Sequence, residues 1–512
     1  MPARRQPAAR ASLDQLLAGL LDAAAASIPA VPVAGLASDS REVLAGGVFV
    51  ALAGASRHGL DFLDAVLAAA PLAVLADAAD ARFDSACRAR IATAGALPVA
   101  VPGLAAALGE IAARFYTRPG AALAPIGVTG TDGKTSVSQF IAAALDAPGR
   151  RCGVIGTLGN GFPGALAASD FTTPDAIGLQ AALADLRAAG ARRVAMEVSS
   201  HGLALQRVAA VPFEIAVLTN LGRDHLDFHG SLDAYRAAKA ALFDWPGLRC
   251  RVLNLDDDFG RELAAAARPG VRDIGYSASA AAGAEFAAAD IDCADSGLRF
   301  TLRTPRGCQP VATRLLGHFN VDNLLASAAA LSACGLDDAD IAARLSALQP
   351  VAGRLERFSA AGRPTAVVDY AHTPQALAAA LAALRPHCSG ALWCLFGCGG
   401  ERDRGKRAEM AAAAEAGADC VVVCDDNPRG ENPQRIIDDI RAGFARPQAV
   451  RVQRDRAAAI AESLAAAAAD DWLLVAGKGH EDYQIVAGER RHYSDRETLL
   501  ALLDPDGRGG GA

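Results

Sequence analysis

The segment best able to do chemistry begins at Gly127 and reads G-V-T-G-T-D-G-K-T-S. An apolar stretch precedes it and a helical stretch, 137–145, follows it. Glycines let backbone N–H groups converge on phosphate oxygens, and the start of the helix adds its positive end. Lys134 would then reach the outer phosphates of a nucleoside triphosphate, and the Thr135 hydroxyl a magnesium ion. Because valine stands at 128, where the standard phosphate loop has a glycine, the pattern predicts a tighter variant of that loop. The alternative is a glycine-rich turn with a solvated lysine.

Two polar clusters follow apolar stretches that read as strands. One is E-V-S-S-H-G-L, starting at Glu197, and the other is T-N-L-G-R-D-H-L-D-F-H-G, starting at Thr219. In open α/β folds ligands bind at the carboxyl ends of the strands, so both clusters belong at the binding edge. A carboxylate and an imidazole there can converge on a metal beside the phosphates. The second cluster packs four metal-ligating side chains into one loop, which favours a metal over a locally hydrogen-bonded histidine: Asp224, His225, Asp227 and His229.

Composition limits the possible classes of protein. The chain has 512 residues with a net charge of −7, which gives no basic footprint for nucleic acid or anionic membranes. No apolar run is long enough to span a membrane, and the N-terminus lacks the apolar region of a signal peptide. We therefore expect a cytoplasmic protein. Two C-x3-C pairs, at Cys394/Cys398 and Cys420/Cys424, are expected to pack in the core as reduced thiols rather than bind zinc.

Apolar strands alternate with helical stretches in two long blocks, which predicts doubly wound α/β architecture. The fold class is α/β with three domains: a small N-terminal α/β domain, a central phosphate-loop ATPase-type parallel sheet and a C-terminal Rossmann-like domain. The expected bounds are 1–120, 121–350 and 351–503, with a disordered tail at 504–512. The strands expected most clearly are Val48–Leu52, Leu72–Leu75, Arg193–Val198, Ile215–Leu218, Arg251–Leu255, Thr365–Val368, Leu392–Phe396, Cys420–Cys424 and Leu473–Val475.

Four further motifs lie downstream in the same order as in one known family. They are L-G-H-F-N-V-D-N from Leu316, D-Y-A-H-T-P from Asp369, F-G-C-G-G-E-R-D from Phe396 and A-G-K-G-H-E from Ala476. Together with the phosphate loop and the two polar clusters, they resemble the Mur ligases, which build the peptide stem of bacterial peptidoglycan. The resemblance runs from about residue 38 to about residue 491, so we identify the chain as a member of that family.

The resemblance implies an amide ligase that adds meso-diaminopimelate to UDP-N-acetylmuramoyl-L-alanyl-D-glutamate and consumes ATP. The D-glutamyl carboxylate would attack the γ-phosphate of ATP, and the incoming amine would displace phosphate from the acyl phosphate. Such chemistry needs neutralised charge more than a protein nucleophile. The catalytic residues implied are Lys134, Glu197, His225 and Lys239. Mg²⁺ would be held by Thr135, Glu197, His225 and Lys239, the last as a carbamate, because carbamylation turns a cation into a carboxylate-like ligand.

The resemblance also implies three binding sets. The ATP-binding set is Gly130, Thr131, Asp132, Gly133, Lys134, Thr135, Ser136, Asn320, Asn323, Arg354 and Asp369. The UDP-substrate set is Ser38, Ser40, Ala55, Ser56, Arg57, Thr172, Thr173, Ser199 and Arg207. The diaminopimelate set is Arg402, Asp426, Asn427, Pro428, Arg429, Gly477 and Glu481. One departure is that Leu205 stands where the family member compared has a glutamine, with Gln206 one place later.

The D-N-P-R motif ending at Arg429 resembles the signature of ligases that take meso-diaminopimelate. That amino acid carries a second carboxylate where lysine carries none, and a planar guanidinium can hold it with two hydrogen bonds. A surface turn with an unrelated arginine would explain D-N-P-R alone, but not with Arg402 and Glu481 in register.

Several other readings stay open on the sequence. A related ligase could add L-lysine, and a folylpolyglutamate synthase shares the central and C-terminal plan but lacks D-N-P-R. A phosphate-loop kinase or GTPase would not need Lys239, His225 or the second α/β domain. An inactive scaffold with the same fold would be expected to have lost loop or metal residues, which are present here. We expect a monomer that binds no nucleic acid and does not insert into membranes.

Overall fold

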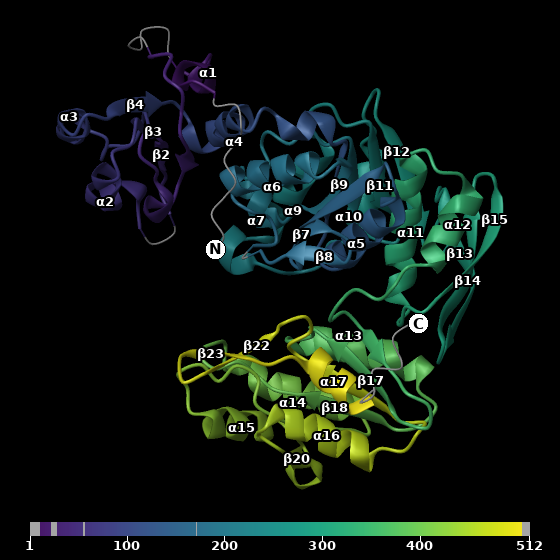
Figure 1. Cartoon of the computed structure of the whole chain (residues 1–512). Helices are drawn as coiled ribbons and strands as arrows, with labels where there is room; N and C mark the ends of the chain where they lie inside the picture. Colours follow the sequence, from purple (N-terminus) through teal and green to yellow (C-terminus); the bar gives the residue numbers. More distant parts are fainter. Residues whose placement is uncertain (1–10, 22–27, 55–56, 170, 504–512) are drawn as a thin grey trace. The chain divides into compact units, whose positions relative to one another are not determined.

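The computed structural model describes residues 11–21, 28–54, 57–169 and 171–503 (Figure 1). Its internal contacts form two compact units, residues 1–275 with 329–334 and residues 276–328 with 335–512. Within the described residues, no helix is both long and apolar enough to cross a membrane. The tail expected at 504–512 lies outside the described residues, and the expected domain bounds stay predictions.

The first unit begins with a small parallel sheet in the order β1-β2-β3-β4. Alternate residues of its strands face two helical layers, as a pleated strand requires. Leu75 packs with α1 and α4, whereas Val74 packs with α2 and α3. The bounds are β1 Leu36–Ala37, β2 Val48–Ala51, β3 Ala73–Asp77, β4 Leu97–Val101, α1 Leu13–Leu17, α2 Leu63–Ala68, α3 Ser85–Thr93 and α4 Leu104–Phe115. Three 3-10 turns lie at Ser40–Glu42, Gly59–Phe62 and Pro119–Ala122.

The second sheet of this unit runs β12-β11-β10-β5-β9-β6-β7-β8. Strands β11, β10, β5, β9 and β6 pair in parallel, and β7 and β8 add an antiparallel edge. The strands are β5 Pro125–Thr129, β6 Arg151–Gly156, β7 Gly159–Phe162, β8 Ala165–Ala167, β9 Ala191–Glu197, β10 Ile215–Leu218, β11 Cys250–Asn254 and β12 Arg272–Ser277. The helices are α5 Lys134–Leu145, α6 Ala176–Ala188, α7 Ser200–Ala204, α8 Leu226–His229, α9 Leu232–Phe243 and α10 Asp258–Ala265. The carboxyl ends of β5, β9 and β10 therefore lie side by side.

The second unit opens with an antiparallel meander that the sequence analysis did not predict. Strands β13 (Phe286–Ala294), β14 (Gly297–Thr304) and β15 (Gly307–Thr313) pair in turn, followed by α11 (Phe319–Ala333) and α12 (Asp338–Ser346). Two residues separate β13 from β14 and two separate β14 from β15, and such short connections allow only antiparallel pairing. The parallel sheet expected for the central domain was therefore wrong for this segment.

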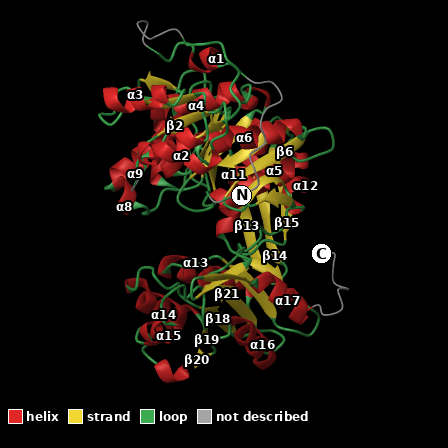
Figure 2. Cartoon of the chain, turned by 60° about the vertical axis from the view of Figure 1, so that its left-hand side comes forward, coloured by secondary structure: helices red, strands yellow, loops and turns green. Residues whose placement is uncertain are grey.

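The C-terminal sheet runs β16-β17-β21-β18-β19-β20, parallel except for β16 (Figure 2). Helices α13, α14 and α15 pack with one set of alternate strand residues, and α16 and α17 with the other. The strands are β16 Glu356–Phe358, β17 Thr365–Asp369, β18 Leu392–Phe396, β19 Cys420–Val423, β20 Arg451–Val452 and β21 Trp472–Ala476, with a hairpin of β22 Tyr483–Val486 and β23 Glu489–His492. The helices are α13 Pro374–Leu384, α14 Gly405–Gly417, α15 Pro433–Arg441, α16 Arg456–Ala466 and α17 Asp495–Leu503, with 3-10 turns at Arg385–His387 and Pro447–Ala449.

The cysteine pairs lie in strands β18 and β19 and in the residues that follow them. Cys394, Cys398 and Cys424 are buried and Cys420 is half-buried, and all four are free thiols. Cys394 packs with one helical layer and Cys424 with the other. The prediction that these cysteines pack as core residues is confirmed.

Two adjacent leucines of α17 test the two-layer packing of the C-terminal sheet. Leu499 is 0% exposed and packs against the sheet, whereas Leu500 is 51% exposed. Leu499→Ala should lower the free energy of unfolding by about 2–5 kcal/mol, because it leaves a cavity. Leu500→Ala should change it by no more than about 0.5 kcal/mol. Urea denaturation followed by tryptophan fluorescence measures both. Equal effects would contradict the placement of α17.

Candidate functional site

The phosphate loop joins β5 to α5 in the first unit. Gly130 has φ 154° and Gly133 has φ 80°, conformations that residues with a Cβ rarely adopt. A Cβ on Gly130 would overlap the Thr219 hydroxyl, so the loop and the end of β10 are in direct contact at this point. The glycine is therefore required by close packing as well as by its backbone conformation.

Hydrogen bonds from the turn after β10 hold this loop. Asn220 accepts from Thr131 N through its carbonyl and from Asp132 N through Oδ1, both at 2.9 Å. The Thr219 hydroxyl donates to the Asp132 carbonyl at 2.6 Å. Hydrogen bonds thus join the two loops that the sequence analysis placed at the same sheet edge.

Lys134 is half-buried and folds back over the loop that precedes it. Its Nζ donates to the carbonyl oxygens of Gly130 at 3.0 Å and Thr131 at 2.8 Å. The ammonium therefore lies beside the N-terminus of α5, where backbone N–H groups and the helix dipole also favour an anion. This arrangement can bind phosphate oxygens.

A buried carboxylate lies at the end of β9. Glu197 is 1% exposed and accepts from the Thr135 hydroxyl at 2.9 Å, the Thr157 hydroxyl at 3.1 Å and Thr157 N at 2.7 Å. None of these three donors carries a positive charge. A carboxylate and a loop hydroxyl are the oxygen ligands that Mg²⁺ prefers, so their chemistry fits a hard divalent cation.

Lys239 on α9 is buried against the same loop. It is 1% exposed, its Nζ donates to the Gly130 carbonyl at 2.6 Å, and the Tyr235 ring centroid lies 4.5 Å from Nζ. Burial, and then the charge of Lys134, lower the pKa of Lys239 to about 6. Its amine is consequently neutral and nucleophilic near pH 7.

Three imidazoles gather beside α8 and α9. The ring centroid of His201 lies 4.7 Å from that of His225 and 5.6 Å from that of His229. Burial lowers the pKa of His201, and the charges of the other two lower it further. The sequence analysis placed His225 and His229 in one loop but did not bring His201 to them, because that contact depends on α7. Among the described residues, no group of three or more His, Cys, Asp or Glu side chains is arranged to hold a metal ion.

Four residues of the expected UDP-substrate set, Thr172, Thr173, Ser199 and Arg207, lie together near Glu197. The Thr173 hydroxyl is 3.0 Å from both the Glu197 carbonyl and the Ser199 hydroxyl, and Arg207 donates to the Thr173 carbonyl at 3.0 Å. The hydroxyl of the adjacent Thr172 is 3.0 Å from that of Thr157, and Thr157 in turn donates a hydrogen bond to the Glu197 carboxylate.

The departure at Leu205 and Gln206 and the expected N-terminal contact residues also lie in the first unit. Gln206 has φ 56°, and the preceding Leu205 is 47% exposed. Ser38 and Ser40 are half-buried just after β1, and the exposed Arg57 places its guanidinium 4.2 Å from the Phe62 ring centroid. Ala55 and Ser56 lie outside the described residues.

In the second unit, the expected nucleotide contacts lie on α11, just before β16 and at the end of β17. Asn320 and Asn323 are buried, and Asn323 Nδ2 donates to Asn320 Oδ1 at 2.9 Å. The guanidinium of the half-buried Arg354 lies 4.9 Å from the Tyr370 ring centroid. Asp369 accepts from Leu355 N at 2.9 Å and Ala371 N at 2.8 Å, while burial raises its pKa.

A buried lysine organises the expected amino-acid site. Lys478 is 0% exposed, and its Nζ lies 3.3 Å from Asp426 Oδ1, 3.3 Å from Asn427 Oδ1 and 3.2 Å from Glu481 Oε2. Asn427 Nδ2 also donates to Glu481 at 3.1 Å. The structure thus brings three predicted contact residues together through a lysine that the sequence analysis did not single out. Its place within A-G-K-G-H-E was the available signal.

The two arginines of the expected amino-acid site differ in exposure. Arg402 is exposed in the loop after β18, whereas Arg429 is half-buried with φ 56°. Arg429 NH1 donates to the Gly400 carbonyl at 2.9 Å and the Asn427 carbonyl at 3.3 Å. Pro428 is buried, and Gly477 has φ 115° after β21. These two carbonyls hold one edge of the Arg429 guanidinium.

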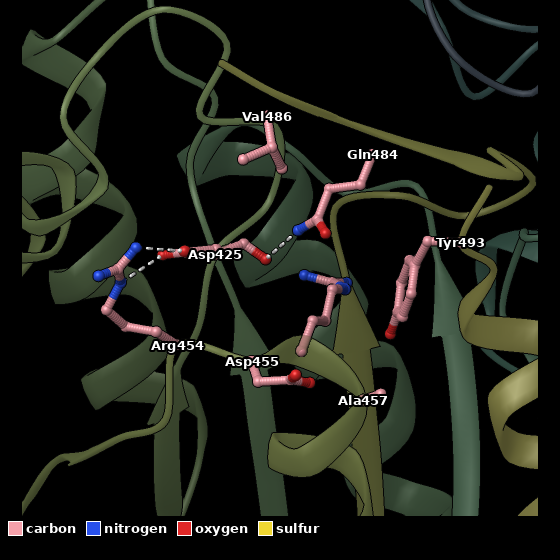
Figure 3. Close-up of a pocket in the computed structure, with 8 residues that line it drawn as sticks. Asp425, Arg454, Asp455, Ala457, Gln484, Val486 and Tyr493 are labelled. Atoms are coloured by element: carbon pink, nitrogen blue, oxygen red, sulfur yellow. Dashed lines mark hydrogen bonds and ion pairs between the residues drawn. The ribbon is translucent and has the colours of Figure 1, made fainter. Parts of the chain in front are cut away.

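A cavity of about 320 Å³ lies behind the D-N-P-R loop (Figure 3). Figure 3 shows Arg454 and Gln484 reaching Asp425 from two sides. Arg454 pairs with the Asp425 carboxylate at 3.0 Å, and Gln484 Nε2 donates to the Asp426 carbonyl at 2.7 Å. These contacts hold the start of the loop.

Comparison with known proteins agrees with this arrangement. Residues 128–331 match the Mur ligase middle domain, and residues 353–479 match the Mur ligase glutamate ligase domain. The chain is 53% identical over 463 residues to UDP-N-acetylmuramoyl-L-alanyl-D-glutamate–2,6-diaminopimelate ligase of Ectopseudomonas mendocina, covering 90% of this chain and 93% of that protein. The chain belongs to the Mur ligase family.

Other relatives of this Mur ligase agree. The ligase of the same name from Alkalilimnicola ehrlichii is 51% identical over 473 residues, covering 92% of this chain and 95% of that protein. A solved structure of a ligase of that name matches with a TM-score of 0.70 and 35% identity, covering 97% of this chain and 99% of that one. Folylpolyglutamate synthase of Mycobacterium tuberculosis has a TM-score of 0.58 at 20% identity and covers 73% of this chain and 92% of that one, a likeness of fold alone.

The lowered pKa of Lys239 predicts a pH dependence of stability. In the unfolded chain this amine has its ordinary pKa of 10.5, and in the folded protein its pKa is about 6. Between those values the folded protein binds one proton fewer, so its stability should rise with pH by at most about 1.4 kcal/mol per unit. Lys239→Met should remove that slope between about pH 7 and about pH 9. Urea unfolding in buffers depleted of carbon dioxide measures it, and equal slopes in both proteins would contradict the neutral amine.

Proposed function

We propose that the protein is an ATP-dependent ligase that joins meso-diaminopimelate to UDP-N-acetylmuramoyl-L-alanyl-D-glutamate, with ADP and phosphate as co-products, in peptidoglycan synthesis. The observation that carries this proposal is the 53% identity, over 90% of the chain, to a ligase named for those substrates. The D-N-P-R loop with its half-buried Arg429 supports the choice of amino acid.

The reaction must activate a carboxylate before an amine can attack it. The D-glutamyl carboxylate attacks the γ-phosphorus of ATP, the bond to the β–γ bridging oxygen breaks, and ADP leaves. The amine of the incoming amino acid then attacks the acyl carbon, phosphate leaves, and one amine proton is lost. Lys134 and the N-terminus of α5 bind the phosphates and stabilise the charge that develops on them.

The chain's own residues fit the magnesium ions that the family implies. Glu197 and Thr135 offer a buried carboxylate and a hydroxyl beside the phosphate loop, and the ring of His225 lies beside that of His201, which follows β9. When bound there, Mg²⁺ would neutralise phosphate charge. We assign Thr135, Glu197, His225 and carbamylated Lys239 as its ligands.

The environment of Lys239 supports carbamylation. Its neutral nitrogen can attack the carbon of carbon dioxide, forming an N–C bond and releasing one proton, and the resulting carbamate carries one negative charge. A carbamate removes the conflict of an amine placed beside cations. Lys239→Ala should be nearly inactive and Lys239→Glu partly active in ligation. Full activity of the alanine variant would refute the assignment.

We assign each group of neighbouring residues to one part of a substrate. Ser38, Ser40 and the segment 55–57 would contact the uridine diphosphate, and the cluster around Thr173 the muramoyl peptide. Asn320, Asn323, Arg354 and Asp369 would complete the nucleotide site. Gly477 and Glu481 would bind the ammonium end of the amino acid, and Lys478 holds the Glu481 carboxylate in place. We further propose that the enzyme is cytoplasmic and acts as a monomer. Light scattering of the purified protein measures its molar mass and so tests the monomer.

The direct test of this function is ligation by the purified enzyme. It should consume ATP and extend UDP-N-acetylmuramoyl-L-alanyl-D-glutamate only when an amino acid is supplied, with meso-diaminopimelate preferred. Preference for L-lysine would favour the related ligase, and extension of a folyl substrate the folylpolyglutamate synthase. No ligation with any amino acid, despite intact loop residues, would favour the inactive scaffold.

Arg429 provides the sharpest prediction about specificity. Its guanidinium should pair with the distal carboxylate of meso-diaminopimelate, and breaking a buried pair costs about 3–5 kcal/mol. Arg429→Ala should raise the KM for meso-diaminopimelate steeply and leave the KM for ATP and for the UDP-substrate nearly unchanged. Preference over lysine should collapse, since the arginine also repels the lysine ammonium. Steady-state kinetics with both amino acids measures this, and a preserved preference would assign the selection to Arg402 or another group.

A further inference from the structure

Two loops of the C-terminal sheet carry the arginines assigned to the amino acid. The loop after β18 carries Arg402 and the loop after β19 carries Arg429. Backbone and side-chain contacts join them: Gly400 N donates to the Asn427 carbonyl at 2.9 Å, and Arg429 NH1 donates to the Gly400 carbonyl at 2.9 Å. A Cβ on Gly399 would lie 2.7 Å from Arg429 NH1, so the loops pack without spare room. The relative position of the two guanidinium groups therefore depends on what fixes these loops.

A buried ion pair fixes them. Arg407, in the first turn of α14, is 0% exposed and donates to Glu431 Oε1 at 3.0 Å and Oε2 at 2.7 Å. The same guanidinium contacts Asp439 at 2.8 Å and the Gly399 carbonyl at 3.4 Å. Glu431 accepts in addition from Glu401 N at 3.1 Å. One arginine and one glutamate thus connect the helix after the first loop, the first loop itself and the end of the second.

Arg407 and Glu431 are both ionised at neutral pH. The hydrogen bonds from Arg407 lower the pKa of Glu431 to about 2, with help from Glu401 N. The fork of the guanidinium meets both carboxylate oxygens, which is the most directional ion pair that proteins form. Because Arg407 is buried, loss of Glu431 would remove both bonds of the fork and leave Asp439 as its carboxylate partner.

We propose that Arg407 and Glu431 are positioning residues that set the geometry with which Arg402 and Arg429 select the distal carboxylate of the amino acid. The inference rests on the proposed function. Neither residue is assigned a contact with substrate. Their effect comes from fixing two guanidinium groups relative to each other, and a displacement of about 1 Å in a positioned group can cost about a hundredfold in rate.

Glu431→Gln is the informative variant. The glutamine has nearly the shape of glutamate, yet Oε1 and Oε2 both accept from Arg407 and Oε2 also from Glu401 N. Wherever the amide nitrogen is placed, it faces a donor, so part of the loop must shift. The matched control is Glu415→Gln in α14, the helix that carries Arg407. The Glu415 carboxylate accepts from Ala445 N at 2.7 Å and Arg446 N at 2.9 Å.

The experiment compares steady-state kinetics and hydrogen exchange of wild type and both variants. Glu431→Gln should raise the KM for meso-diaminopimelate by about tenfold or more and lower the preference over lysine by a similar factor. Its KM for ATP and for the UDP-substrate should stay within about twofold of wild type, and exchange at 397–404 and 427–431 should quicken. Glu415→Gln should leave all four kinetic quantities within about twofold.

The results that would contradict the proposal fall into two kinds, one concerning the wild-type enzyme and one concerning the variant. If wild type does not ligate meso-diaminopimelate, the proposed function is wrong and this inference falls with it. If wild type does so but Glu431→Gln changes every KM alike, or changes stability alone, the pair is structural and the positioning role is refuted. Should Glu431→Gln not fold, Arg407→Lys carries the same test, because it keeps the charge but loses the fork.

Discussion

The close packing of Gly130 against Thr219 is the contact on which the rest of the first unit depends. It brings the end of β5 against the end of β10 with no room for a Cβ, and Asn220 then holds the loop by its backbone. The Gly130 carbonyl in turn accepts from both Lys134 and Lys239. One glycine therefore sets the place of two amines, one that is suited to bind phosphate and one that burial makes neutral.

Buried basic side chains have different surroundings in the two units. Lys239 has no close carboxylate among its described contacts, so burial lowers its pKa and prepares it for reaction with carbon dioxide. Lys478 and Arg407 are equally buried, but each meets carboxylates, and each ties loop residues together. The first unit thus uses burial to change the chemistry of an amine, and the second uses buried pairs to fix geometry.

Much of the fold was predictable because parallel strands have a strong local signal. Strands Ile215–Leu218 and Leu392–Phe396 have the predicted bounds, since a short apolar run between turns leaves little choice. The meander β13–β15 was missed, because its strands are partly exposed and their alternation is weak. The polar clusters that begin at Glu197 and Thr219 were predictable too, because each directly follows a strand that the sequence indicates clearly. His201, Lys478 and Arg407 were not, because their partners come from other elements and only tertiary packing brings them together.

The affinity of the purified protein for ATP, with Gly130→Ala compared with wild type by calorimetry, tests most directly whether this packing builds the phosphate site. Gly164→Ala is the matched control, because Gly164 also has a positive φ, 81°, but a Cβ there meets nothing within 4 Å. Gly130→Ala should lose at least about tenfold in affinity, or about 1.4 kcal/mol, while Gly164→Ala binds ATP as wild type does. Wild-type affinity in a folded Gly130→Ala protein would contradict this account.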